Sequence, residues 1–327
     1  MNRKLTVALI AASFATAGII GTASAKTTVR IGTLAPKHSP WGKVFSKWAE
    51  EVDKKTNSEV EVQWLWNGTA GPESSMVGKI KAGQISGAAI TAVGLSAIHK
   101  PIVALQMPGA FESWAALDKA RDALKPDFDK AMTEQGFYVA GWGDVGVARI
   151  MSRGYAVKVP DDLKGKTPGH ISTDIIGPKV YEVIGGITPK PADVVEFLPL
   201  LNANAIDALN TPALAAEQLQ WSSRLDHLNT GITGYGVGAT VMSEAEMAKL
   251  SPEHRQIMQD VGSKAAQALT KIIRKEDDKA FERLRSKMTT HEQTAAEREV
   301  WQAVFKKACN RVKSALSADV LTKIGYC

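Results

Sequence analysis

The triplet Gly165-Lys166-Thr167 matches the end of a phosphate-binding P-loop, in which a lysine and a hydroxyl side chain hold nucleotide phosphates. A P-loop also needs a glycine five residues before the second glycine, and Pro160 stands at that position. Pro168 follows the triplet, lacks an N–H group and disfavours the helix that would have to start at the lysine. We therefore expect no nucleotide site in this loop.

A second glycine-rich motif, GWGDVG at residues 141–146, fits the dinucleotide fingerprint G-x-G-x-x-G and follows a predicted strand. That fingerprint must open a helix, so that the helix N-terminus meets the pyrophosphate. The residues that follow, Val147–Met151 (VARIM), are typical of an extended segment instead. The motif favours a flexible crossing between two lobes, and we predict no cofactor.

Patterns typical of catalysis or metal binding are scarce. The sequence holds no G-x-S-x-G, no S-x-x-K and no H-E-x-x-H motif, and its cysteines do not form C-x-x-C. The histidines are scattered, at positions 38, 99, 170, 227, 254 and 291. We predict no catalytic residues and no metal site. An enzyme whose site assembles only in the folded chain remains an alternative.

Strands that alternate with helices are expected to position the functional residues. Hydrophobic patterns predict strands at residues 29–34, 60–66, 85–93 and 137–142, with helices between them, which indicates a parallel α/β sheet. A second set begins near residue 149 and includes strands at 187–190 and 205–210. Residues 235–242 resemble a strand that returns to the first set, and a long helical tract starts at Pro252.

This pattern predicts an α/β fold with two lobes, joined by hinge strands and followed by long C-terminal helices. The first lobe would comprise residues 26–146, with residues 236–275 returning to it, and the second lobe residues 147–235. Residues 276–327 would form the C-terminal helices. Such a hinged pair of lobes is suited to enclosing a small molecule.

The N-terminus predicts export. Arg3 and Lys4 precede an apolar run from Leu5 to Gly21, and the small residues at 23–25 (ASA) form a cleavage site. We predict a signal peptide at residues 1–25, cleavage after Ala25 and a periplasmic product; an uncleaved membrane anchor is the alternative. No later stretch reaches the roughly 18 apolar residues of a membrane helix, so we expect the mature chain not to span the membrane.

Two further features agree with an exported binding protein. Cys309 and Cys327 are the only cysteines, and in an oxidising compartment such a pair is more often a disulfide than a metal site. The bridge would tie the C-terminal segment to the last long helix. The net charge of +6 is mild and the basic residues are dispersed, so we expect no nucleic-acid partner.

Aromatic residues near predicted strand ends are the clearest sign of a ligand site. Trp41, Trp66, Trp142 and Tyr235 all lie at or next to such ends, where open α/β folds bind their ligands. Each alone could be a core side chain. Together they predict an apolar cleft, in which Asp144, from the glycine-rich crossing, is a further candidate ligand contact.

Short segments along almost the whole chain resemble the solute-binding proteins of TRAP (tripartite ATP-independent periplasmic) transporters. The matching segments are GTLAP at 32–36, KAGQI at 81–85, GF at 136–137 leading into GW at 141–142, VPDDLKG at 159–165, ID at 206–207 and LSPE at 250–253. The resemblance implies a two-lobed fold of the periplasmic-binding-protein type. It also implies a receptor that closes on a small molecule and delivers it to TRAP membrane permease subunits.

The residues with which the family binds carboxylates are replaced in this sequence. The family's arginine, which forms a bidentate bridge to the ligand carboxylate, corresponds to Gly169, with His170 next to it. A glutamate and an asparagine of the family correspond to Asn210 and Thr211, and a further arginine corresponds to Val147. The carboxylate clamp that the resemblance implies is therefore missing.

We expect a neutral or partly apolar ligand, held by tryptophans and by Asn67, Asn210 and His170, because a carboxylate enclosed without a counter-charge would lose several kcal/mol on desolvation. In the competing hypothesis, Arg149, Lys166 or His170 supplies the missing positive charge from a new position. An exported enzyme and a sensor without a transport role are the alternatives outside transport.

Overall fold

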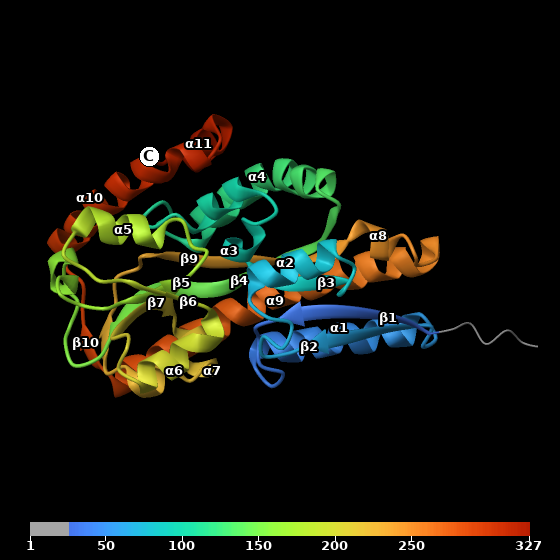
Figure 1. Ribbon diagram of the computed structural model, residues 1–327, viewed down its shortest axis with the longest axis horizontal. Helices are drawn as coiled ribbons and strands as arrows, with labels where there is room; N and C mark the ends of the chain where they lie inside the picture. The colour runs from blue at the N-terminus through green and yellow to red at the C-terminus, as the bar shows by residue number, and fades with distance from the viewer. Residues whose placement is uncertain (1–25) are drawn as a thin grey trace, which may run out of the picture.

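One mixed sheet runs through both halves of the computed structural model, which describes residues 26–327 (Figure 1). The predicted signal peptide and its cleavage site lie outside the described residues. The strand order is β10-β8-β4-β9-β3-β1-β2, with β7 paired to β4, and β5 and β6 form a small separate sheet. The strands are β1 (Thr27–Thr33), β2 (Val60–Leu65), β3 (Gly87–Thr91), β4 (Phe137–Ser152), β5 (Gly169–Ile171), β6 (Lys190–Ala192), β7 (Ala208–Pro212), β8 (His227–Asn229), β9 (Gly234–Ser243) and β10 (Thr289–His291).

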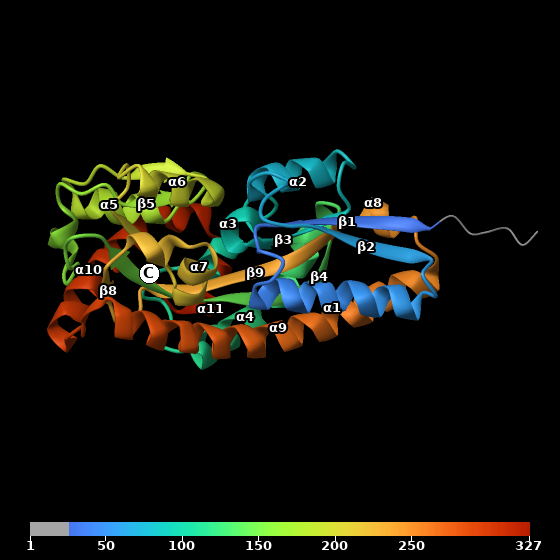
Figure 2. The same ribbon diagram turned by 90° about the horizontal axis from the view of Figure 1, so that it is seen from below.

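Helices cover both faces of this sheet, so the predicted α/β class with two lobes and long C-terminal helices is confirmed (Figures 1 and 2). The predicted lobe boundaries stay a prediction, and the one at residue 275 falls inside a continuous helix. The helices are α1 (Pro40–Lys55), α2 (Glu73–Lys81), α3 (Ala92–Leu95), α4 (Trp114–Glu134), α5 (Gly177–Ile184), α6 (Phe197–Asn202), α7 (Ala213–Gln218), α8 (Glu244–Met247), α9 (Pro252–Lys287), α10 (Ala295–Val312) and α11 (Ala318–Ile324).

The prediction of a parallel sheet is wrong for its centre. Strand β1 pairs in parallel with β2 and β3, but β9 runs antiparallel to both β3 and β4. The reason is the chain path, because β4 leads from the first lobe to the second and β9 leads back. The sequence also predicted two extended segments where the structure has the single 16-residue strand β4, whose pairing with β9 shifts register near Gly141 and Gly146.

The glycines of the GWGDVG motif let α9 approach β4 closely. A Cβ atom added at Gly141 would lie 2.3 Å from Cβ of Ala266, and one at Gly143 would lie 2.9 Å from Cδ2 of Leu269. Helix α9 is 36 residues long and runs beneath both lobes (Figure 2). The motif therefore serves helix-on-strand packing, which explains its spacing without a cofactor.

A side-chain cap fixes the start of α1 close to the carboxyl end of β1. The Ser39 side chain accepts a hydrogen bond from the Gly42 N–H group, and Pro40 is the first helical residue. The buried face of the helix packs into the first-lobe core through Val44, Phe45, Trp48 and Val52. Trp41, in the first turn, is thereby held at the carboxyl end of β1.

The C-terminal helices contact both lobes. Helix α10 packs against α5 of the second lobe, whereas α11 packs against α4 of the first lobe. The predicted disulfide joins Cys309 in α10 to Cys327, just beyond α11. None of the helices within residues 26–327 has both the length and the apolar character needed to cross a membrane.

Candidate functional site

A cavity of about 340 Å³ lies between the two lobes and reaches the hinge strands β4 and β9. Ligand pockets in proteins commonly measure about 300–1,000 Å³, so this cavity is large enough for a small molecule. Its walls are mainly apolar and aromatic. The candidate residues Trp41, Trp142, Asp144, His170, Asn210 and Tyr235 line it, whereas Trp66, Asn67 and Arg149 do not.

The two residues that follow β2 lie away from the cavity wall. The ring of Trp66 stacks on Trp64, with their centroids 5.7 Å apart. Asn67 is exposed, has a positive φ of 54° and donates its backbone N–H to the Ala35 carbonyl. Asn67 therefore forms a turn, and Trp66 extends the aromatic cluster of the first-lobe core.

Arg149 points to the other face of its strand. Its neighbours Ala148 and Ile150 line the cavity, and side chains alternate between the two faces of a strand. The guanidinium group of Arg149 lies 3.9 Å from the ring centroid of Phe281 in α9, and burial lowers its pKa. Arg149 is thus held between β4 and α9.

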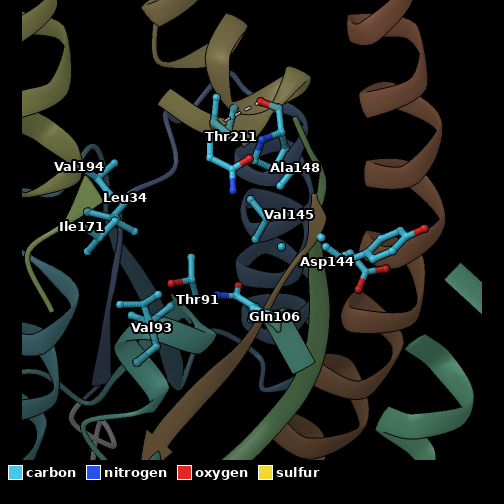
Figure 3. A pocket seen from close by; sticks show the side chains of 18 of the residues that line it. Leu34, Thr91, Val93, Gln106, Asp144, Val145, Ala148, Ile171, Val194 and Thr211 are labelled. Carbon is cyan, nitrogen blue, oxygen red and sulfur yellow. Dashed lines mark hydrogen bonds between the residues drawn. The ribbon is translucent and has the colours of Figure 1, made fainter. Parts of the chain in front are cut away.

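Asp144 contributes its backbone to the cavity and turns its carboxylate away from it (Figure 3). The carboxylate accepts hydrogen bonds from Nη1 of Arg121 at 2.6 Å and from Nε of Arg274 at 2.7 Å. Arg274 also binds Asp118 through both terminal nitrogens. This buried network joins α4, β4 and α9, so the Asp144 side chain stabilises the hinge region.

The aromatic side chains that line the cavity are fixed from behind. Nε1 of Trp142 donates a hydrogen bond to Asp129, and Nε1 of Trp41 donates one to the Asp144 carbonyl, 3.3 Å away. Tyr235 packs against Trp114 with a centroid distance of 4.6 Å. Because the indole nitrogens of Trp41 and Trp142 bind protein acceptors, these two rings offer the cavity chiefly apolar surface.

Polar groups line the cavity at the hinge and at β5. The Asn210 Oδ1 atom accepts a hydrogen bond from the Thr233 hydroxyl at 2.6 Å. A Cβ atom at Gly169 would lie 2.9 Å from Ile206 and 3.0 Å from Leu209, which are core residues of the second lobe. Gly169 thus has no room for an arginine on that side. The other two β5 residues, His170 and Ile171, both line the cavity, and His170 lies beside Tyr181.

Two acidic residues of the cavity wall were not predicted. Glu73 accepts hydrogen bonds from the N–H and hydroxyl groups of Thr91, and burial raises its pKa. Asp174 accepts hydrogen bonds from the N–H groups of Ile176 and Gly177, and burial raises its pKa as well. Both acids are held by neutral donors, and neither belongs to a motif that a sequence search could detect.

The charges of the wall are one-sided. Of the described residues that line the cavity, none is an arginine or a lysine, whereas Glu73 and Asp174 are acids, and the third acid, Asp144, turns its carboxylate away towards Arg121 and Arg274. Lys166, another candidate for a relocated charge, does not line it either and lies 4.2 Å from the Tyr155 ring centroid. In residues 26–327 no group of three or more His, Cys, Asp or Glu side chains could hold a metal ion.

The two lobes meet at the rim of the cavity. Leu34 of the first lobe lies close to Ile171 and Val194 of the second (Figure 3). Farther along the rim, a Cβ atom added at Gly68 would lie 2.8 Å from Cγ1 of Val195. Residues of the two lobes therefore lie close to one another along this rim.

Comparisons with known proteins agree with this architecture. The family model of the bacterial extracellular solute-binding proteins, family 7 (DctP), matches residues 31–315. A solute-binding protein of Verminephrobacter eiseniae is 24% identical over 278 residues, which cover 82% of this chain and 80% of that protein.

Solved structures share the fold. A TRAP periplasmic solute-binding protein of Sulfurospirillum deleyianum with bound succinate matches with a TM-score of 0.85 and 17% identity, over 92% of this chain and 99% of that one. The sugar-acid-binding protein DctPAm of Advenella mimigardefordensis, in complex with galactonate, matches with a TM-score of 0.86 and 16% identity, over 92% of this chain and 97% of that one. The chain belongs to the DctP family, the family 7 solute-binding proteins of TRAP transporters.

Proposed function

We propose that this TRAP solute-binding protein is a periplasmic receptor for an uncharged, partly apolar small molecule, which it delivers to TRAP permease subunits. The observation that carries the proposal is the absence of arginine and lysine from the described cavity wall. A ligand carboxylate enclosed there would meet Glu73 and Asp174 with no arginine or lysine to balance its charge, and desolvation without such a partner costs several kcal/mol.

The apolar walls supply the affinity that an ion pair supplies in a carboxylate-binding site. Burial of hydrocarbon contributes about 25 cal/mol per Å² of apolar surface removed from water. Thr91, Gln106, Asn210 and Thr211 line the cavity near the hinge strands and can orient a polar group of the ligand (Figure 3). The ligand then shifts the equilibrium between open and closed lobes towards the closed state, by an amount set by how much more tightly it binds that state.

A calorimetric screen of residues 26–327 tests the proposal. We expect uncharged amphiphiles such as alkanols to bind, and succinate and galactonate, the ligands of the two related structures, not to bind up to millimolar concentration. Micromolar binding of either acid would contradict the proposal. Turnover of a bound molecule would instead favour the exported-enzyme alternative.

A gain-of-function variant sharpens the test. His170→Arg places a guanidinium on a β5 residue of the cavity wall, so we expect it to acquire carboxylate binding. His38→Arg is the matched control, because His38 is exposed and is not among the described residues that line the cavity. Equal carboxylate binding by both variants would show that the site, as described, does not set the ligand charge.

A further inference from the structure

The cavity continues beyond the hinge into the second lobe. Its wall there includes Val180 of α5 and Trp301 and Phe305 of α10, together with Leu163 and Ile150. We call this part the second-lobe extension. Helices α5 and α10 lie side by side at this end of the molecule (Figure 1). The extension therefore reaches α10, a helix outside the hinge strands and the first lobe.

The walls of the second-lobe extension belong to a hydrophobic core cluster. Val180, Trp301 and Phe305 are each at most 5% exposed and pack in the same cluster. Protein cores are close-packed, and space left beside such residues forfeits dispersion contacts. Nε1 of Trp301 donates a hydrogen bond to the Lys158 carbonyl at 2.9 Å, so the indole offers the cavity an apolar face. An apolar space of this kind does not hold water well and binds hydrocarbon.

The far wall is a fixed part of the fold. A capping box of Thr294 and Glu297 starts α10, and the Cys309–Cys327 disulfide ties the helix to the segment after α11. A ligand tail would therefore enter a preformed space, which reduces the ordering cost of binding. Polar residues line the same cavity on other elements, among them Thr91 of β3 and Asn210 of β7, which pairs with the hinge strand β4.

We infer that the ligand is an uncharged amphiphile whose hydrocarbon tail fills the second-lobe extension while its polar head lies at the hinge strands. This inference rests on the proposed function and adds the shape of the ligand to it. Each methylene of such a tail that the extension buries makes the free energy of binding more favourable. Affinity must then increase with tail length and stop increasing when the extension is full.

A series of unbranched alkanols from butan-1-ol to decan-1-ol tests this, with calorimetry on residues 26–327. The association constant should rise about fourfold for each added methylene and then level off. Val180→Phe fills the extension, so the plateau should come at a shorter tail and the affinity for the longest alkanols should fall about tenfold or more. Val180→Ala enlarges the extension and should move the plateau to a longer tail.

Val300→Phe is the matched control, because it adds the same side chain to α10 at a position that is 49% exposed. It should leave the whole series unchanged. The opposite shifts expected of the two Val180 variants separate filling of the cavity from loss of the fold, and circular dichroism checks that each variant is folded.

The outcomes separate this inference from the proposed function. If short alkanols bind but affinity does not depend on tail length, or if Val180→Phe behaves like Val300→Phe, the inference is wrong and the uncharged-ligand proposal stands. If no alkanol binds and carboxylates do, the proposed function fails and the inference fails with it. A tail-length dependence that responds to Val180 supports both.

Discussion

Replacement of Asp144 by asparagine tests whether this residue stabilises the hinge or contacts the ligand. The variant keeps the side-chain volume and removes one negative charge from a network of two acids and two arginines. The Asp144 side chain is fully buried, and that of its partner Arg121 is 10% exposed. Loss of one partner from a buried ion pair costs about 3–5 kcal/mol.

The lower end of that range applies to Asp144→Asn. Arg121 and Arg274 both keep Asp118 as a partner, and the Arg274 side chain is 21% exposed. We therefore expect a loss of about 3 kcal/mol. For a protein of this size the loss should lower the melting temperature by about 5 °C. The affinity of the folded variant for the best-binding alkanol should remain that of the wild-type protein.

Thermal unfolding and calorimetry on the same sample decide the question. Glu217→Gln is the matched control, since the pair of Glu217 and Arg283 lies at the surface, with the arginine side chain 45% exposed. Such pairs contribute about 0.2–1 kcal/mol, so the control should lose less than about 2 °C. A variant of Asp144 with unchanged melting temperature and tenfold weaker binding would refute the assignment of this side chain to the hinge.

Three further predictions follow from the rim, the surface of α4 and the disulfide. Gly68→Val should hold the lobes apart and weaken ligand binding, because its Cβ would lie 2.8 Å from Val195, whereas Gly136→Val, at a glycine that also has a positive φ but whose added Cβ meets no atom within 4 Å, should not. Small-angle scattering with ligand compares the two variants, and equal compaction of both would contradict this prediction. Hydrogen bonds from Arg274 lower the pKa of Asp118 below its ordinary value of 3.8, so the contribution of Asp118 to stability is complete above that value and is lost as pH falls through the lower pKa of the folded state. Asp118→Asn should therefore make the melting temperature depend less steeply on pH in this acid range, and an unchanged slope would count against the pairing. The Cys309–Cys327 bridge closes a loop of 19 residues, counting both cysteines, so the double variant Cys309→Ser/Cys327→Ser should lose roughly 3 kcal/mol of stability in α10 and α11 on the chain-entropy model. Hydrogen exchange in α11 measures this loss, and unchanged protection would show that packing alone holds the helix.

Local signals predicted much of the fold. The helical tract predicted from Pro252 is α9, and the alternation of strands and helices indicates the α/β class. The antiparallel centre of the sheet could not be predicted in the same way, because the direction of β9 depends on the path of the whole chain. The glycines at 141 and 143 suggested a break between strands, whereas their packing against α9 is visible only once that helix is placed.

The site was predictable where it depends on strand ends. Trp41 lines the cavity from the first turn of α1 and Tyr235 from the start of β9, whereas Trp142 lines it from within β4 and not from the strand end that the sequence predicted. The side of the sheet to which Arg149 points depends on the pleat of β4, which the glycines obscure in the sequence. Trp301 and Phe305 were missed because their helix lies far along the chain from every strand of the cleft and carries no motif.

The long strands β4 and β9 also limit how the two lobes can evolve. The two strands stay hydrogen-bonded to each other from one lobe to the other, and their pairing is broken only by the register shifts near Gly141 and Gly146. Each lobe therefore takes part of its sheet from strands that continue into the other lobe. Neither lobe is a module that recombination could exchange at a simple linker. A chimera with a relative would have to cut both strands and α9 at matching positions, and new ligand specificity in this architecture is therefore acquired by substitution within the walls.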